Sequence, residues 1–276
     1  MLTPAGRELP ERRGRELLER RGVQLGNYLN ADTKRPLTDT PLSRELRAPP
    51  SASDGAPVGI GTGISALPFR KARWHVLGVE PDERMAGYAQ RAGLEVEIAT
   101  FEDWDPEGRT FDLVIAGQTW HWVDPVLGAS RAAEVLRPGG RIALFWNVMT
   151  FPADIGERFS AVYRQVFPEF PFFQNGTPGG IDSYAPLLDK AKDGLRRTRS
   201  FDEPEPWQFD WERPYTREEW LEQVPTFGGH SQIRPEKLTE LLAGIGEMID
   251  SAGGSFIMGY TAVVVTARTS SAEEAS

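Results

Sequence analysis

The 276-residue sequence contains no cysteine and only three histidines, His75, His121 and His230, which lie far apart along the chain. Disulfides and Cys-ligated zinc are therefore excluded, and a histidine-based metal site is not expected. No apolar run approaches the roughly 20 residues that a membrane-spanning helix needs, and no N-terminal stretch has the apolar core of a secretory signal. We expect a cytoplasmic protein that holds no metal ion and does not bind membranes.

An excess of positive charge is also missing. The chain has 31 Lys and Arg against 40 Asp and Glu, a formal net charge of −9, which argues against nucleic acid as a partner. Residues 1–57 differ from the rest, because they are rich in Pro, Ser, Thr and charge and offer few apolar side chains. This composition predicts an atypical, disordered N-terminal segment. The sequence leaves the oligomeric state open.

From Val58 onward, short apolar runs alternate with segments of helical length. The apolar runs are 74–80, 94–100, 111–118 and 140–147, and the helix-length segments among and after them are 82–92, 125–136 and 154–167. Strands that alternate with helices at intervals of about 20 residues indicate βαβ units and hence a parallel sheet.

The C-terminal third has a different pattern. The stretch 206–215 alternates like a strand, and Thr216 with Glu219 forms a capping box that opens a helix. A helix over 235–250 precedes a long strand over 255–268. We expect the last two strands to pair as an antiparallel edge of the sheet.

These boundaries divide the chain into three parts. The main domain is expected at 58–268, with a loop or cap insertion within 168–230, and residues 269–276 are expected to form a disordered tail. The aromatic, Pro- and Gly-rich stretch 168–180 is the expected loop of that insertion.

Three glycines at alternate positions, Gly59, Gly61 and Gly63, lie in the stretch VGIGTGI at 58–64, and Glu80 follows Gly59 by 21 residues. In a doubly wound sheet, glycines after the first strand let the backbone approach a nucleotide, and an acid after the second strand takes the ribose hydroxyls. The spacing here is G-x-G-x-G, since Ile64 follows Gly63. That spacing counts against an NAD-dependent oxidoreductase, whose fingerprint is G-x-G-x-x-G.

The segments VGIGTGIS, GVEPDERM, FDLVIAGQTWHWVDP and VLRPGGRIALFWN together resemble the class I S-adenosylmethionine-dependent methyltransferases of the methyltransferase type 11 group. They are most similar to the trans-aconitate-methyltransferase-like subset, and the resemblance covers roughly residues 58–268. It implies an α/β, three-layer, doubly wound Rossmann-like fold with a seven-stranded, mostly parallel sheet and an antiparallel edge strand. It also implies S-adenosylmethionine as cofactor and a small-molecule methyl acceptor.

The resemblance assigns cofactor-binding roles to named residues. The glycines at 59, 61 and 63 would let the backbone approach the methionine part and the adenosine, and Glu80 would hold the ribose diol. Pro81, Asp82 and Met85 would line that side, with Met85 against the adenine.

Three further residues complete the expected cofactor site. Phe101 and Glu102 lie in the stretch that borders the adenine ring in the family, and Gln118 would face the methionine moiety.

Position 57 departs from the family pattern. The family has an Asp or Glu two residues before the first glycine, where it helps to bind the amino group of the cofactor, whereas this sequence has Pro57. Proline and glycine also weaken a central strand. The departure supports a second hypothesis, a catalytically impaired or regulatory methyltransferase-fold protein with weak or no cofactor binding.

His121 is the candidate catalytic residue, flanked by Trp120 and Trp122. It could act as a general base or hydrogen-bond the acceptor, since its unperturbed pKa is about 6.5. Alternatively, both tryptophans pack beneath the following helix and His121 caps the loop. Methyl transfer from a sulfonium requires alignment more than acid–base chemistry.

Two other groups allow two interpretations. An aromatic cluster either roofs an apolar acceptor pocket or packs an irregular loop onto the sheet; it comprises Phe167, Phe170, Phe172 and Phe173. His230 either contacts an acidic substrate or is an exposed loop residue.

Overall fold

Strands and helices alternate along the chain in the computed structural model, which describes residues 54–168, 179–227, 230 and 233–270. The strands are β1 (Asp54–Val58), β2 (His75–Val79), β3 (Glu95–Glu97), β4 (Phe111–Gly117), β5 (Leu136–Thr150), β6 (Glu205–Thr216) and β7 (Ser255–Arg268). The α-helices are α3 (Leu67–Lys71), α4 (Glu83–Arg91), α5 (Pro125–Val135), α6 (Ala153–Val166), α7 (Ala185–Thr198), α8 (Arg217–Gln223) and α9 (Pro235–Ser251).

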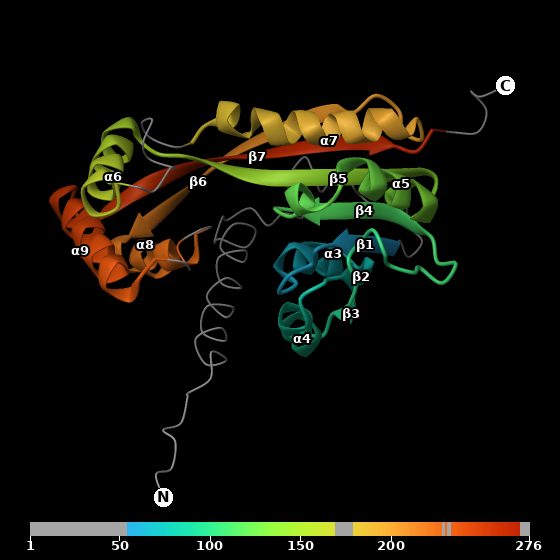
Figure 1. Ribbon diagram of the computed structural model, residues 1–276, viewed down its shortest axis with the longest axis horizontal. Helices are drawn as coiled ribbons and strands as arrows, with labels where there is room; N and C mark the ends of the chain where they lie inside the picture. Colours follow the sequence, from blue (N-terminus) through green and yellow to red (C-terminus); the bar gives the residue numbers. More distant parts are fainter. Residues whose placement is uncertain (1–53, 169–178, 228–229, 231–232, 271–276) are drawn as a thin grey trace, which may run out of the picture.

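The strands form one seven-stranded sheet in the order β3-β2-β1-β4-β5-β7-β6 (Figure 1). β1 to β5 are parallel to one another, β7 is antiparallel to β5, and β6 is antiparallel to β7. The predicted mostly parallel α/β sheet is therefore confirmed. Its antiparallel edge consists of two strands, with the reversed strand β7 inside and β6 at the edge.

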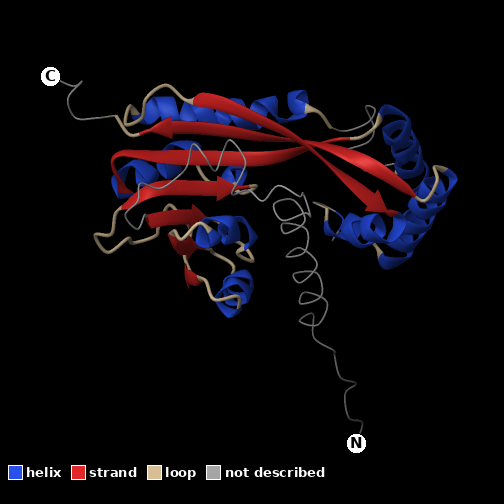
Figure 2. Ribbon diagram, turned by 180° about the vertical axis from the view of Figure 1, so that it is seen from behind, coloured by secondary structure: helices blue, strands red, loops and turns tan. Residues whose placement is uncertain are grey.

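Helices cover both faces of the sheet (Figures 1 and 2). Side chains alternate along β4, so that Val114 and Ala116 join the apolar cluster under α5 and α7, whereas Leu113 and Ile115 join the cluster under α3 and α4. This alternation explains why 111–118 reads as a continuous apolar run, because both faces of a parallel sheet are buried.

A third apolar cluster lies at the far ends of β5, β6 and β7, beyond the end of β4, where α6, α8 and α9 pack together (Figure 1). We call α6, α8 and α9 with these strand ends the helical lobe. Since α6 directly follows β5, the lobe lies on the side of the sheet toward which the parallel strands end. Its core includes Phe159, Tyr163, Trp220 and Ile245, all nearly inaccessible to solvent.

β1 forms in the middle of the sheet despite Pro57. Its backbone pairs with β4 at four consecutive residues, Gly55 to Val58, but its register with β2 passes from Gly55 directly to Val58. The gap falls where Pro57 has no N–H to donate. The domain therefore includes residues 54–57, which precede the predicted start at 58, while residues 1–53 lie outside the described residues.

The structure also differs from the predicted C-terminal boundary of the domain and from the predicted insertion. The first two residues of the predicted tail belong to the domain, because Thr269 N donates to Gly140 O at 2.9 Å and Ser270 N to Ser200 O at 3.0 Å. The predicted insertion within 168–230 holds regular structure, namely α7, β6 and α8. Most of the expected loop at 168–180 lies outside the described residues.

Across the described ranges, no helix combines the length and the apolar character that a membrane crossing requires.

Two glycine substitutions test the helix packing. A Cβ at Gly194 in α7 would collide with the backbone carbonyl of Pro125 in α5, whereas a Cβ at Gly87 in α4 would meet only the flexible end of Arg91, at 3.5 Å. We expect Gly194→Ala to lower the free energy of unfolding by about 1–3 kcal/mol through overpacking. Gly87→Ala should raise it by about 0.5–1 kcal/mol through helix propensity. Urea denaturation measures both, and a neutral Gly194→Ala would show that α5 and α7 do not pack this closely.

Candidate functional site

The glycine loop follows β1 and lies in close contact with other segments of the chain. Gly59, Gly61 and Gly63 have φ angles of +56°, +58° and +90°, a region that favours glycine. A side chain at Gly59 would also collide with Thr119, and one at Gly63 with Leu94. The loop therefore needs glycine at both of these positions for conformation and for space.

Glu80 directly follows β2 and is nearly fully buried beside this loop. Its Oε2 accepts a hydrogen bond from Gly61 N at 2.8 Å, and its Oε1 accepts one from Asp82 N at 3.1 Å. Burial raises the pKa of the Glu80 carboxyl above its ordinary value, while the two backbone N–H groups oppose that rise. The structure thus brings the predicted acid and the glycine loop into direct contact.

The turn after Glu80 opens α4. Asp82 caps this helix, because its Oδ1 accepts hydrogen bonds from Arg84 N at 2.9 Å and Met85 N at 3.3 Å. Pro81 is exposed and Met85 half-buried. Pro81 directly follows Glu80 and Met85 lies in the first turn of α4, and their roles toward an adenine stay predictions.

Phe101 and Glu102 make structural contacts with the α5 side of the sheet. The Phe101 ring is 3% exposed and lies 6.1 Å from the Trp104 ring and 6.3 Å from the Trp120 ring. Glu102 Oε1 accepts a hydrogen bond from Asp124 N at 2.9 Å, at the start of α5. Their roles beside an adenine ring stay predictions, and the Phe101 side chain belongs to the core.

Gln118 occupies an unusual backbone conformation at the carboxyl end of β4. Its φ is +57°, which costs a non-glycine residue on the order of 1–3 kcal/mol and is typical of functional sites. Its backbone N–H donates to Phe145 O at 2.9 Å, and its Nε2 donates to Asn147 O at 3.2 Å. These bonds hold the side chain of Gln118 between β4 and β5.

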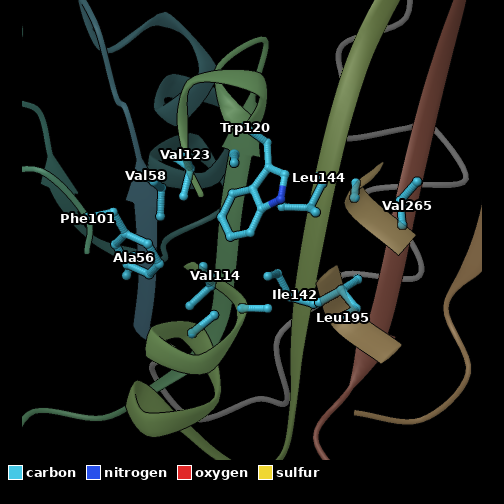
Figure 3. Packing of buried hydrophobic residues seen from close by; sticks show 14 of the residues in the cluster. Ala56, Val58, Phe101, Val114, Trp120, Val123, Ile142, Leu144, Leu195 and Val265 are labelled. Atoms are coloured by element: carbon cyan, nitrogen blue, oxygen red, sulfur yellow. The ribbon is translucent and has the colours of Figure 1, made fainter. Parts of the chain in front are cut away.

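The two tryptophans around His121 behave differently. Trp120 is buried in the cluster under α5 (Figure 3), and a Cβ at Gly128 of α5 would lie 3.0 Å from its ring. Trp122 is 82% exposed. The interpretation that both pack beneath the following helix is therefore correct for Trp120 and wrong for Trp122.

His121 lies half-buried in the 3₁₀ turn Trp120–Trp122. Its Nδ1 is buried and has no hydrogen-bond partner among the described residues. Burial lowers the pKa of His121, and the positive charge of Lys190 in α7 lowers it further. The imidazole is accordingly neutral at pH 7 and has a nitrogen available for a hydrogen bond.

Thr62 is a site residue that the sequence reasoning missed. It lies between Gly61 and Gly63, is 3% exposed, and its Oγ1 has no hydrogen-bond partner in the described structure. A buried hydroxyl without a partner calls for an explanation such as a ligand or a bound water. Its place between two glycines of the loop was the available signal.

Within the described part of β1, no acid lies beside the glycine loop where the family has one at position 57. The nearest preceding acid, Asp54, lies at the start of β1, which is the opposite end of the strand from the glycine loop. Its carboxylate pairs with Arg137 Nη2 at 2.7 Å. The site therefore contains the carboxylate of Glu80 but not a second one from β1.

His230 is neither an exposed loop residue nor a member of this site. It is 3% exposed in the helical lobe, and its Nε2 lies 2.9 Å from the Tyr163 hydroxyl. Phe167 packs against the same lobe. The other aromatic residues predicted to act with Phe167, namely Phe170, Phe172 and Phe173, lie outside the described residues.

The histidine titration provides a test. In the folded state the pKa of His121 lies below its ordinary value of about 6.5, whereas the unfolded chain has the ordinary value. At a pH between the folded and the unfolded pKa, the unfolded chain therefore binds more protons. This site therefore makes the fold more stable as the pH rises through that interval. NMR titration of the three histidines should show His121 titrating below 6.5, and Lys190→Met should raise its pKa. An unshifted His121 would contradict the burial described here.

Comparison with known proteins agrees with the fold and the glycine loop. A family model described as a methyltransferase domain matches residues 57–144. The match includes the glycine loop, Glu80, Gln118 and His121.

Sequence relatives match about a third of the chain. An uncharacterized methyltransferase of Mycobacterium bovis is 37% identical over 93 residues, which are 33% of this chain and 38% of that protein. A ubiquinone biosynthesis O-methyltransferase of Nitrobacter winogradskyi is 32% identical over 93 residues, 31% of this chain and 35% of that protein. The match thus spans less than two fifths of the length of these relatives.

Solved structures share the fold over a larger range. A protein assigned as a type II methyltransferase from Anaeromyxobacter dehalogenans has a TM-score of 0.60 and 18% identity, covering 83% of this chain and 96% of that one. A protein assigned as a methyltransferase of an antibiotic biosynthesis pathway in Anabaena variabilis has a TM-score of 0.55 and 16% identity, covering 81% and 94%. The trans-aconitate-methyltransferase-like subset stays a prediction. Residues 57–144 thus match the model of a methyltransferase domain, and the described chain shares its fold with these solved structures.

Proposed function

We propose that this protein transfers the methyl group of S-adenosylmethionine to a small-molecule acceptor. The observation that carries the proposal is the contact between Glu80 and the glycine loop, in which the buried carboxylate is held by Gly61 N at the carboxyl edge of the parallel sheet. In doubly wound sheets this edge is where ligands bind. The net charge of −9 supports small molecules over nucleic acid as partners, and we place the reaction in the cytoplasm.

The residues of the site fit the ribose and adenosine part of the cofactor. Each oxygen of Glu80 accepts one backbone hydrogen bond and retains a lone pair, so that the carboxylate can also accept from ribose hydroxyls. The unpartnered hydroxyl of Thr62 is available in the same loop. Gln118 would contact the methionine part, because its Nε2 is engaged with Asn147 O and its amide oxygen can accept.

When bound, S-adenosylmethionine would supply a methyl group on a positively charged sulfur, which departs as a neutral thioether while the acceptor atom gains the methyl group and loses a proton. His121 is neutral at pH 7 and is the candidate to hydrogen-bond the acceptor or take that proton. The main requirement on the protein is to align the acceptor and exclude water.

A second candidate function has an observation of its own. Because Pro57 replaces the family acid and Asp54 is paired with Arg137 at the other end of β1, the amino group of the cofactor lacks its usual partner. A methyltransferase-fold protein that binds the cofactor weakly, or not at all, would have this feature.

Calorimetric titration with S-adenosylmethionine and its demethylated product separates the two candidates. We expect micromolar binding to the full chain, and Glu80→Ala should weaken it about 10- to 100-fold, because hydrogen bonds to a charged group are lost. Glu95→Ala, which removes an exposed acid from the neighbouring strand β3, is the matched control and should leave affinity unchanged. No detectable binding to the unaltered protein would reject the enzyme and favour the second candidate.

Restoring the acid provides an independent test. Pro57→Asp should raise the affinity for S-adenosylmethionine about tenfold, because a carboxylate would again be available to the amino group. The affinity for 5′-methylthioadenosine, which lacks the α-amino group of the methionine part, should not change. An equal gain for both ligands would mean that the substitution acts by stabilising β1 rather than by contacting the amino group.

A further inference from the structure

Two buried residues of α8 have side-chain polar atoms without a hydrogen-bond partner among the described residues. Gln223 is 3% exposed, and both its Nε2 and its Oε1 lack a hydrogen-bond partner. Trp220 is fully buried, and its Nε1 also lacks a partner. The two residues are three apart on one helix and therefore lie on the same face. A buried side-chain amide with neither end bonded is rare in folded proteins, since buried polar groups are normally satisfied.

Aromatic rings surround the Trp220 side chain. The Trp220 ring lies within 6 Å, centroid to centroid, of five other rings. They belong to Phe151, Phe159, Tyr215, Phe227 and Phe256. Gln223 and Trp220 carry no charge, so that they could not compensate a buried ion. The surroundings therefore suit an uncharged, planar group.

The same region is joined to the glycine loop through neighbouring residues. A Cβ at Gly59 would collide with Thr119, and the preceding residue, Gln118, donates from its side chain to Asn147 O of β5. The chain continues from β5 to Phe151, whose ring lies 5.9 Å from that of Trp220. Four residues of extended chain from Asn147 to Phe151 span about 13 Å. The helical lobe thus extends from the edge of the sheet at which the cofactor is proposed to bind.

We propose that Gln223 and Trp220 bind the methyl acceptor, and that the acceptor is an uncharged planar compound with adjacent hydrogen-bond donor and acceptor groups, as in a carboxamide or a lactam. The Gln223 oxygen would accept from the donor of the ligand, while Gln223 Nε2 and Trp220 Nε1 would donate to its carbonyl oxygen. This inference rests on the proposed function, because it names the substrate class of the same methyltransferase.

Benzamide is a suitable probe, because it joins one amide edge to one ring. Benzoate has the same shape but a negative charge and no donor, and toluene has no polar edge. In calorimetric titrations of the full chain we expect benzamide to bind at least tenfold more tightly than benzoate or toluene. In NMR spectra the Trp220 indole N–H resonance and the Gln223 side-chain amide resonances should shift with added benzamide.

Gln223→Leu should weaken benzamide binding at least tenfold, and Gln223→Met serves as a second variant of similar shape. Gln208→Leu, on the exposed face of β6, is the matched control and should bind benzamide as the unaltered protein does. The S-adenosylmethionine titration is run on every variant and should be unchanged.

The outcomes separate the two proposals. If S-adenosylmethionine binds but benzamide does not, or if benzamide binds equally to Gln223→Leu, the acceptor site is rejected and the proposed function stands. If benzamide does not bind and Gln223→Leu raises the unfolding temperature, the amide is an unoccupied polar group or is held by a water, which also rejects the site. If S-adenosylmethionine does not bind to the unaltered protein, the proposed function fails, and with it the assignment of the ligand as a methyl acceptor.

Discussion

The short strand β1 is held between β2 and β4, and its unbroken backbone pairing with β4 over Gly55 to Val58 fixes where the chain turns into the glycine loop. That turn ends at the position where Gly61 N meets the Glu80 carboxylate and where Gly59 lies against Thr119. The pairing with β2 is weaker, because the proline in the strand has no N–H. The candidate site thus depends more on the pairing of β1 with β4 than on its pairing with β2.

The described residues form two regions that share β5, β6 and β7. The parallel strands present Glu80, Gln118 and His121 at their carboxyl ends, whereas the helical lobe is an aromatic core built on the far ends of the longer strands. Buried polar atoms without partners occur in both regions, as Thr62 in the loop and Gln223 in the lobe show. This distribution is expected of a domain that binds one molecule at the sheet and aligns a second one beside it.

Local patterns were sufficient to predict the strands 74–80 and 111–118 and the helices 125–136 and 154–167, because each is a buried run or an apolar stripe. α7 was missed because its inner face uses Ala191 and Gly194, which give a weak apolar signal although both lie against other elements. β1 was not predicted, because proline and glycine usually exclude a central strand. The residues of β1 do not by themselves favour a strand, and β1 forms because the neighbouring strands β2 and β4 pair with it.

The candidate site likewise contains residues that could be predicted from the sequence and residues that could not. The loop glycines and Glu80 could be identified from spacing, since their roles depend on the order of elements in a doubly wound sheet. Glu102, whose carboxylate bonds Asp124 N, and His230, which bonds Tyr163, could not be placed, because each contact joins residues that are far apart in the chain. The unpartnered atoms of Gln223 are visible only once the packing around Trp220 is known.

Among the described strands β6 lies at the edge of the sheet, where an edge strand could recruit a strand from another molecule and begin aggregation. Its sequence counters that risk. Pro206 and Pro214 each remove one backbone donor, and Asp210 and Glu212 place negative charge on its exposed face. Strand exchange between copies is therefore disfavoured along this edge, so that a long and partly aromatic edge strand does not make the protein prone to fibre formation.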